Sequence, residues 1–230
     1  MKTSLLCIIL TLFLFSCSAE PDFEKIGNQP SAAESAIVEN QYRPNTVNPF
    51  DAEGKKIYEA LQLYYQNHGV PNCVTELADQ IRYIAERNFR DATMTSRLIP
   101  FTDEMVQDIM EDPDNTMILI VQNSMLQPYA KENLISFLQN LIAKRQEEFN
   151  IVCSYIMDYE TEVLEDATFT AEETETLLTV SSISKYSLYS EEERKDKDWD
   201  ILNGNKPARP FFGKNEVPVV FIVALLDKII

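Results

Sequence analysis

Histidine and glycine are scarce in this chain of 230 residues, and their scarcity argues against several kinds of site. His68 is the only histidine, and no Gly-x-Ser-x-Gly sequence is present, so a Ser-His-Asp hydrolase site has little support. One histidine and a few distant cysteines do not provide the paired ligands of a zinc site. With five glycines there is no glycine-rich loop for phosphate, and a turn-rich β fold is disfavoured. We therefore predict no catalytic residues, no metal site and no cofactor.

Basic residues are also few. The chain has 20 lysines and arginines against 37 acids, which gives a net charge of −17 at pH 7. Loss of an N-terminal segment containing Lys2 would bring it to −18 (19 bases against 37 acids). Such a charge disfavours nucleic acids and anionic membrane surfaces, and it attracts cations or basic proteins. Solubility alone is the simpler explanation for it.

The N-terminal segment has the pattern of a secretory signal peptide. Lys2 supplies a positive charge, and residues 5–15 form an apolar run, broken only by Thr11, that is too short for a spanning helix. The sequence Leu14-Phe15-Ser16-Cys17 resembles the lipobox of bacterial lipoproteins, where a peptidase cuts before a cysteine modified with diacylglycerol. The resemblance implies a signal peptide over residues 1–16 and a lipid anchor on Cys17. The alternatives are an ordinary signal peptide and an uncleaved anchor.

The residues after Cys17 are similar to the sorting region of lipoproteins. Ser18 rather than Asp follows the cysteine, which implies the outer membrane of the cell envelope rather than retention in the inner one. Acids at Glu20, Asp22 and Glu24 resemble a surface-export signal of some Gram-negative groups. The resemblance therefore implies an envelope protein that faces the periplasm or is exposed on the surface.

Residues 17–50 are predicted to be a flexible tether. They contain four prolines and no sustained apolar period. A coil of ~30 residues has an end-to-end distance of about 30 Å, enough to hold a domain clear of lipid headgroups. We place the globular domain at residues 51–230.

Within the domain, apolar residues recur at helical spacing, and we predict an all-α, bundle-like domain of six or seven helices. A first helix should end at Gly69, and Thr102 should cap another. Thr170 and Glu173 have the spacing of a capping box at the start of a later helix. Residues 112–115 are predicted to be a turn. The apolar run 117–121 fits a buried strand or a helix, and we predict a helix because a single strand would have no partner. Residues 190–200 are densely charged, and the apolar run 217–226 is too short to span a bilayer.

Two cysteines remain for the domain, Cys73 and Cys153. An oxidising compartment would allow a disulfide between them. They can equally be separate buried residues, because the sequence does not give the distance between their Cα atoms.

Residues 158–175 hold eight acids and no base, and this stretch is the best candidate site. The candidate acidic binding face consists of Glu162, Glu165, Asp166, Glu172 and Glu173. Calcium prefers many oxygen ligands, but the spacing fits no EF-hand and the glycine that such a loop needs is missing. A helix face exposed to solvent is the simplest explanation of the acids.

These observations favour a non-catalytic lipoprotein of the cell envelope that binds another molecule, with capture or neutralisation of a basic protein as the specific hypothesis. Its membrane contact would be the lipid on Cys17, and nucleic acid is not expected as a partner. The alternative is an envelope hydrolase that uses carboxylates, which would require two of them to converge in a cleft.

Overall fold

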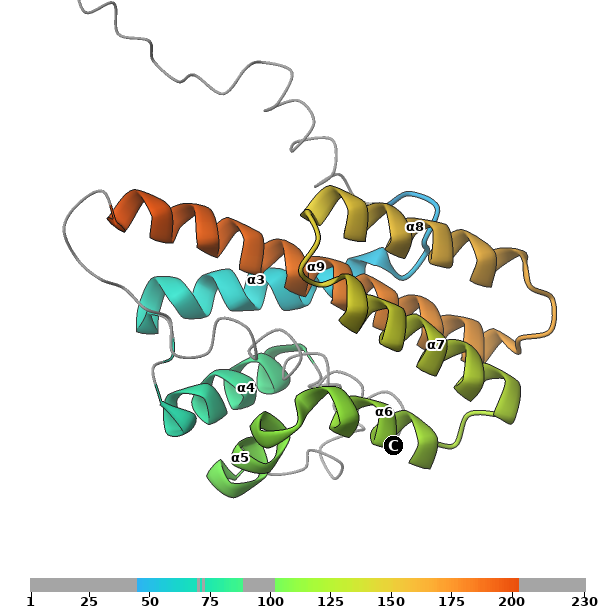
Figure 1. Ribbon diagram of the computed structural model, residues 1–230, viewed down its shortest axis with the longest axis horizontal. Helices are drawn as coiled ribbons and strands as arrows, with labels where there is room; N and C mark the ends of the chain where they lie inside the picture. Colours follow the sequence, from blue (N-terminus) through green and yellow to red (C-terminus); the bar gives the residue numbers. More distant parts are fainter. Residues whose placement is uncertain (1–44, 70, 72, 89–101, 203–230) are drawn as a thin grey trace, which may run out of the picture. The chain divides into compact units, whose positions relative to one another are not determined.

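The computed structural model describes residues 45–69, 71, 73–88 and 102–202, with side chains as far as Glu193. This part of the chain contains seven helices and no strand, which confirms the all-α prediction (Figure 1). The helices are α3 (Asp51–His68), α4 (Val74–Asn88), α5 (Asp103–Glu111), α6 (Pro113–Asn123), α7 (Pro128–Lys144), α8 (Phe149–Glu165) and α9 (Ala171–Leu202).

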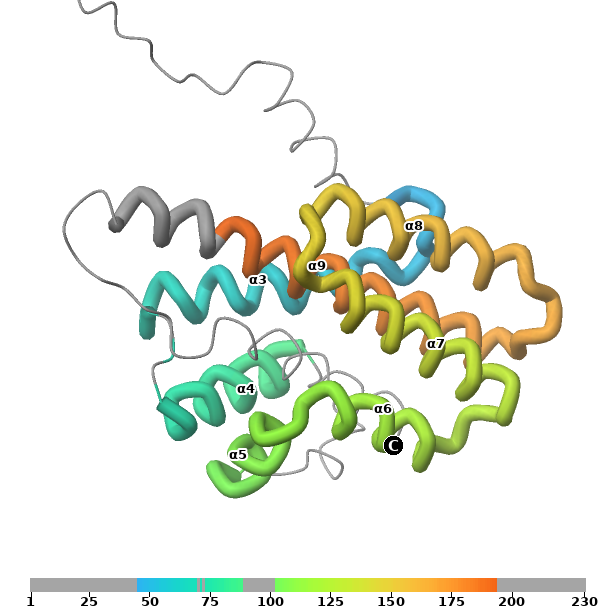
Figure 2. The backbone as a smooth tube through the Cα atoms, viewed as in Figure 1, coloured from blue at the N-terminus to red at the C-terminus, as the bar shows by residue number. Residues whose placement is uncertain are grey.

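The helix α9 is the centre of the packing. It contacts α3, α7 and α8 (Figure 2). Every residue from 176 to 187 is buried. Hydrogen bonds join residues 51–62 of α3 to residues 182–193 of α9 in the same order along both helices. The two helices therefore run in parallel.

The other helices complete one hydrophobic core. The helix α4 packs on α3, α5 on α4, and α6 on both α5 and α7. Between α7 and α8, the ring of Phe137 stacks on Tyr159 with centroids 4.1 Å apart and on Tyr155 at 5.7 Å. Leu134, Leu138 and Ile156 are fully buried around them, as the helical spacing of the sequence predicts.

Two helix ends match the sequence predictions. Gly69 follows α3 with φ of 74°, a conformation that glycine adopts without steric cost. Thr102 caps α5, because its hydroxyl accepts a hydrogen bond from the amide of Met105 at 3.2 Å.

The turn predicted at residues 112–115 is wrong. Asp112 caps a new helix by accepting a hydrogen bond from the amide of Asn115 at 3.3 Å, and Pro113 is the first residue of α6. Proline suits this position because the first amide of a helix has no partner within the helix. The apolar run 117–121 lies inside α6, so the helix prediction for it is confirmed.

The helix α9 is longer than its apolar pattern indicates. The densely charged residues 190–200 continue the helix to Leu202, because Glu, Lys and Arg are good helix formers and no proline or glycine interrupts them. Among the described residues, no helix combines the length and the apolar character that crossing a membrane requires. The predicted signal peptide, Cys17, most of the predicted tether and the apolar run 217–226 lie outside the described residues.

The packed domain includes residues 45–50, which the sequence assigned to the tether. Asn45 and Asn48 are buried and hydrogen-bonded to Glu160 in α8. Apolar periodicity cannot reveal such a segment, because polar side chains hold it.

The two domain cysteines are free thiols in the structure. Cys73 is exposed, and Cys153 is buried in α8. Of the two alternatives left by the sequence, the structure therefore has the unpaired one, with only Cys153 in the core.

Candidate functional site

The acidic stretch begins in the last turns of α8 and ends in the first turn of α9. Glu162 and Glu165 project from α8, Asp166 caps its end, and Glu172 follows at the start of α9. Glu162, Glu165 and Glu172 are exposed, and Asp166 is partly exposed. We call these four carboxylates the acidic edge. From residue 146 to residue 184 the sequence has ten acids and no base, so no neighbour in sequence neutralises the edge.

Glu173, the fifth residue of the predicted binding face, has a structural role instead. It is buried, with 7% of its surface exposed. Its Oε2 accepts hydrogen bonds from the Thr170 amide at 2.9 Å and the Thr170 hydroxyl at 3.0 Å, and its own amide donates to that hydroxyl at 3.2 Å. This is the predicted capping box, which satisfies free amides at the start of α9.

The same carboxylate also joins two parts of the fold. Glu173 Oε1 accepts a hydrogen bond from the amide of Gln127, just before α7, at 3.2 Å. The hydrogen bond from the Thr170 amide is the main reason that the pKa of Glu173 is lowered. A carboxylate with these donors is not available to a partner.

Asp166 lies beside an aromatic side chain. The Tyr129 hydroxyl donates to Asp166 Oδ2 at 2.7 Å, and the amide of Thr168 donates to Oδ1 at 2.8 Å. The hydrogen bond from Tyr129 is the largest cause of the lowered pKa of Asp166, and it raises the pKa of Tyr129. The Tyr129 ring also packs on Phe169, with centroids 5.2 Å apart.

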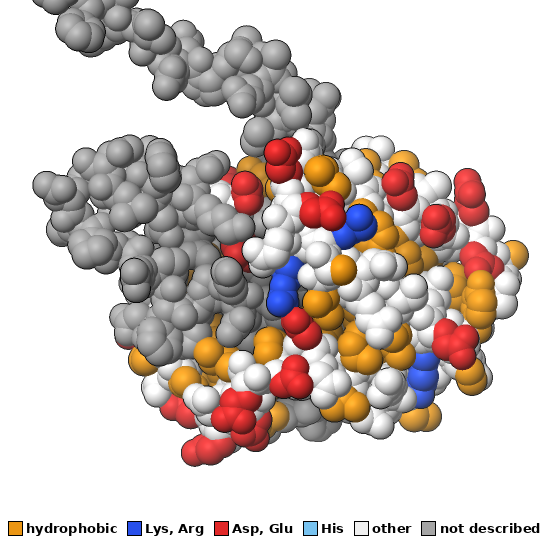
Figure 3. Space-filling view, in the orientation of Figure 1, with side chains coloured by type: hydrophobic (Ala, Val, Ile, Leu, Met, Phe, Trp, Pro, Cys, Tyr) orange, Lys and Arg blue, Asp and Glu red, His pale blue; other side chains and the backbone are white. Residues whose placement is uncertain are grey.

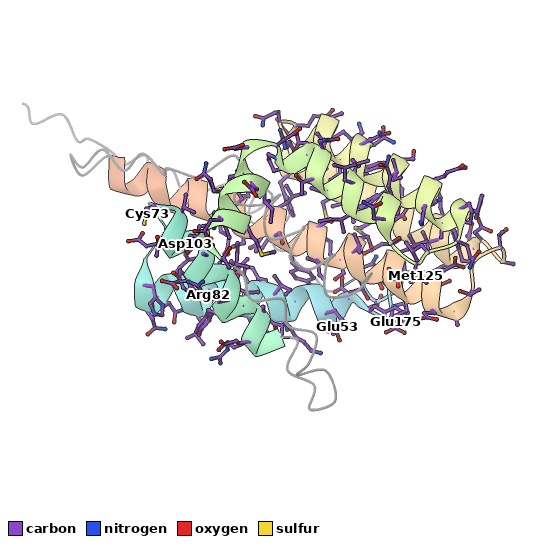
Figure 4. The ribbon with its side chains drawn as sticks, turned by 90° about the horizontal axis from the view of Figure 1, so that it is seen from below. Glu53, Cys73, Arg82, Asp103, Met125 and Glu175 are labelled. Carbon is purple, nitrogen blue, oxygen red and sulfur yellow. The ribbon has the colours of Figure 1, made fainter. Side chains whose placement is uncertain are left out.

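Exposed apolar side chains border the acidic edge. Tyr129 is 48% exposed, Met125 in the preceding loop is 85% exposed, and Leu164 in α8 is 39% exposed. In Figure 4, Met125 and Glu175 both lie toward the end of the view opposite to Cys73 and Asp103. On the face drawn in Figure 3, acidic side chains are spread among hydrophobic ones and basic side chains are sparse. The surface therefore combines negative charge with apolar contact area.

Glu160 belongs to the same acidic stretch but is fully buried. Its carboxylate accepts hydrogen bonds from Asn45 Nδ2 at 2.5 Å, Asn48 Nδ2 at 2.6 Å and the Ser181 hydroxyl at 2.9 Å. A buried carboxylate requires such donors, since its charge would otherwise be strongly unfavourable. Glu160, like Glu173, is thus part of the folded framework.

A buried ion pair lies next to this group. Lys185 of α9 contacts Asp51 at the start of α3, and both side chains are buried. The Tyr186 hydroxyl donates to Asp51 Oδ2 at 2.9 Å, and the amide of Asn45 donates to the same oxygen at 3.1 Å. Nearby, burial raises the pKa of the Cys153 thiol, with smaller effects of Lys185, Glu160 and Asp51.

The sequence did not point to this polar cluster. A signal was present in residues 181–187, where Lys185 follows three serines and an isoleucine on a helix with an apolar start. Lysine is rarely buried unless it is paired, so a lysine in the centre of a buried helix indicates an acidic partner elsewhere. The pattern does not reveal that the partner is Asp51.

His68 has a local role at the end of α3. Its ring stacks on Tyr64 with centroids 4.6 Å apart, and its Nδ1 lies 3.3 Å from the Tyr64 carbonyl oxygen. The side chain is exposed. Within the described ranges, no three His, Cys, Asp or Glu side chains gather in a way that could hold a metal ion.

No protein-family model matches the chain, and comparisons with curated proteins and with solved structures found no match either.

Proposed function

We propose that this protein is a non-catalytic binding module of the cell envelope that captures a basic partner through the acidic edge. The observation that supports this most is the division of the acids between residues 158 and 175. Glu160 and Glu173 are buried and hydrogen-bonded, whereas Glu162, Glu165 and Glu172 are exposed and form no ion pair within the described part of the chain. A cluster of like charges without counterions repels itself, and a basic partner would relieve that repulsion.

The chemistry of the partner follows from the border of the edge. Lysines and arginines would face Glu162, Glu165 and Glu172, and an apolar group would cover Met125 and Tyr129. Exposed charges increase the rate of encounter more than they increase affinity, while buried apolar and aromatic contacts slow dissociation. A protein segment with alternating basic and apolar residues has both properties.

The location is the second part of the proposal. A lipid on Cys17 would hold the protein in the outer membrane of the cell envelope, with the domain facing the periplasm or exposed on the surface. Three acyl chains at ~0.8 kcal/mol per buried CH₂ would make attachment effectively permanent, whereas one chain would not. Replacing Cys17 by Ser and following cell fractionation tests this. If the variant stays in the membrane fraction like the wild type, the lipid anchor is wrong.

The binding face is tested by neutralising it. We expect the triple variant Glu162→Gln, Glu165→Gln and Glu172→Gln to capture less basic protein from envelope extract than the wild type, with slower association. These side chains form no hydrogen bond with the fold in the described structure, so thermal unfolding should change little. Salt should release the captured protein as the Debye length falls from about 10 Å at 0.1 M to ~3 Å at 1 M.

The helix α5 offers a matched control. Glu104, Asp108 and Glu111 are exposed acids at helical spacing on one side of α5. Changing them to Gln, Asn and Gln removes the same charge elsewhere on the surface, and capture should remain near the wild-type level. Equal losses in both triple variants would show that net charge matters rather than the acidic edge. Turnover of an envelope substrate by the pure protein would overturn the non-catalytic function.

A further inference from the structure

Two asparagines tie the segment before α3 to the middle of the domain. Asn45 and Asn48 are 7% and 3% exposed, and their Nδ2 atoms donate to the two oxygens of Glu160 at 2.5 and 2.6 Å. Asn48 Nδ2 also lies 3.1 Å from the carbonyl oxygen of Leu178 in α9. In Figure 1 this blue segment lies beside α8. We call residues 45–50 the latch segment.

The backbone fixes which way the two carboxamides point. Asn45 Oδ1 accepts a hydrogen bond from the amide of Val47 at 3.1 Å, and Asn48 Oδ1 accepts one from the amide of Phe50 at 2.8 Å. Turning either carboxamide over would place its NH₂ group against those amides. Each Nδ2 atom is therefore directed at Glu160 by the local turn.

Because both carboxamides direct their NH₂ groups at residue 160, the side chain there must accept hydrogen bonds on both of its terminal atoms. Both oxygens of Glu160 face N–H donors, and the Ser181 hydroxyl, which has a single proton, lies 2.9 Å from both Glu160 Oε1 and the Leu178 carbonyl oxygen. A carboxylate can accept on both of its oxygens, as this arrangement requires. A glutamine would direct its own NH₂ group at one of the asparagine NH₂ groups.

The charged and titratable groups around Glu160 come from three helices. Asp51 at the start of α3 is paired with Lys185 of α9 and accepts from Tyr186, while Cys153 lies in α8 with its thiol buried. Lys185 contacts Asp51, and the side chains that contact Glu160, namely Asn45, Asn48 and Ser181, are neutral. The latch segment thus supplies two of the three hydrogen bonds that stabilise this buried charge.

Apolar contacts contribute less to holding the segment. Thr46 is exposed and Val47 is 56% exposed, and only Phe50 at its end packs against the core. A segment with few apolar contacts opens locally at a free energy set mainly by its hydrogen bonds. The two bonds to Glu160, at 2.5 and 2.6 Å, are shorter than the 3.1 Å bond from the Asn45 amide to the carboxylate of Asp51, and hydrogen bonds to carboxylates exceed those between neutral groups.

We propose that residues 45–50 form a latch, held closed by the side chain of Glu160, that fixes the start of the domain to α8 and α9. Residues 45–50 precede α3 in the chain, so a pull transmitted along the backbone from the N-terminal side reaches the contacts with Glu160 before it reaches α3. Opening uncovers Glu160, two residues from Glu162 of the acidic edge. The latch does not depend on what the acidic edge binds.

The test is the variant Glu160→Gln in the full chain, followed by amide hydrogen exchange. The amides of Val47 and Phe50 report on the latch, since they donate to the two asparagine side chains. We expect them to exchange about tenfold faster or more, which corresponds to the loss of roughly one hydrogen bond to a charged group. Amides inside α7 should exchange at the wild-type rate.

If Glu160→Gln acted only by removing a buried charge, the Val47 and Phe50 amides would exchange at the wild-type rate or more slowly. A neutral residue of the same size often leaves stability unchanged or increases it. Unchanged or slower exchange at Val47 and Phe50 in Glu160→Gln would therefore overturn the latch. So would faster exchange that extends equally through α7, because the whole domain would then be loosened.

A second variant removes the donors instead of the acceptor. The double change Asn45→Ala and Asn48→Ala should also expose the segment to protease, and cleavage is the measurement here because the change removes the acceptors of the Val47 and Phe50 amides as well. The control is Thr46→Ala, whose side chain is exposed in the same segment, and it should behave like the wild type. Equal protection in the double variant and in the control would overturn the proposal.

Discussion

Replacing Gly54 by alanine should destabilise the domain, although alanine is the better helix former. Gly54 lies in the first turns of α3, where this helix meets α9. An alanine Cβ at this position would lie 2.4 Å from the carbonyl oxygen of Ser182, 2.4 Å from its hydroxyl oxygen and 2.5 Å from its carbonyl carbon. Two of these three atoms are backbone, so a change of side-chain rotamer cannot remove the clash.

The magnitude follows from two opposing effects. Alanine in place of glycine favours a helix by about 1 kcal/mol. Against this, an ordinary contact begins near 3.4 Å, so α3 and α9 would have to separate by about 1 Å at their closest approach. Overpacking of this kind costs ~1–3 kcal/mol or more. Separation would also lengthen the hydrogen bond from the Gly54 amide to the Ser182 hydroxyl, now 3.2 Å, which contributes about 1 kcal/mol.

The net expectation is a loss of roughly 1–3 kcal/mol in the free energy of unfolding, measured by urea titration. Thermal unfolding should shift downward by about 2–4 °C for each kcal/mol in a domain of this size. Lys55→Ala, at the exposed neighbouring position, is the control and should change stability by less than about 0.5 kcal/mol. An unchanged or increased stability of Gly54→Ala would show that the two helices are not in backbone contact.

Three further predictions address buried groups. Lys185→Met leaves Asp51 buried without its cation and should lower the free energy of unfolding, measured in urea, by about 3–5 kcal/mol. Combining it with Asp51→Asn should lower that free energy by less than the sum of the two single changes. Because folding lowers the pKa of Glu173, the ionised side chain stabilises the fold above pH 4.5, and this stabilisation is lost as the pH falls further. The difference in free energy of unfolding between the wild type and Glu173→Ala should therefore shrink below pH 4.5. Exposed Cys73 should react readily with a thiol reagent, whereas Cys153, whose pKa is raised by burial, should react only on unfolding.

Much of the fold was predictable because the helices have strong local signals. Apolar residues at helical spacing identified the core faces of α3, α4, α7 and α8, and polar residues such as Thr102 and Thr170 identified helix starts. Residues 112–115 were misread because Asp-Pro-Asp-Asn suits both a turn and a capped helix start, and local sequence does not distinguish them. The length of α9 was missed for a related reason, since a highly charged stretch also suits an exposed loop.

The candidate site was only partly predictable. The sequence located a cluster of acids, but it could not tell which of them were buried. Glu173 was recognised as a capping residue and still counted as part of the face, although one carboxylate cannot serve both roles. Glu160 could not be distinguished from Glu162 without knowing that Asn45 and Asn48, more than a hundred residues earlier, fold back onto α8.

The small polar residues of α9 connect these observations. Serine at position 182 lets the α3 backbone approach closely, and it satisfies the Gly54 amide and the Asp51 carbonyl at the same time. Serine at position 181 provides one of the donors to Glu160. Leucines in their place would bury more apolar area, but they would remove these donors and force α3 and α8 outward. The polar composition of this buried helix therefore sets the positions of both the latch segment and α8, and through α8 it determines where the acidic edge is presented.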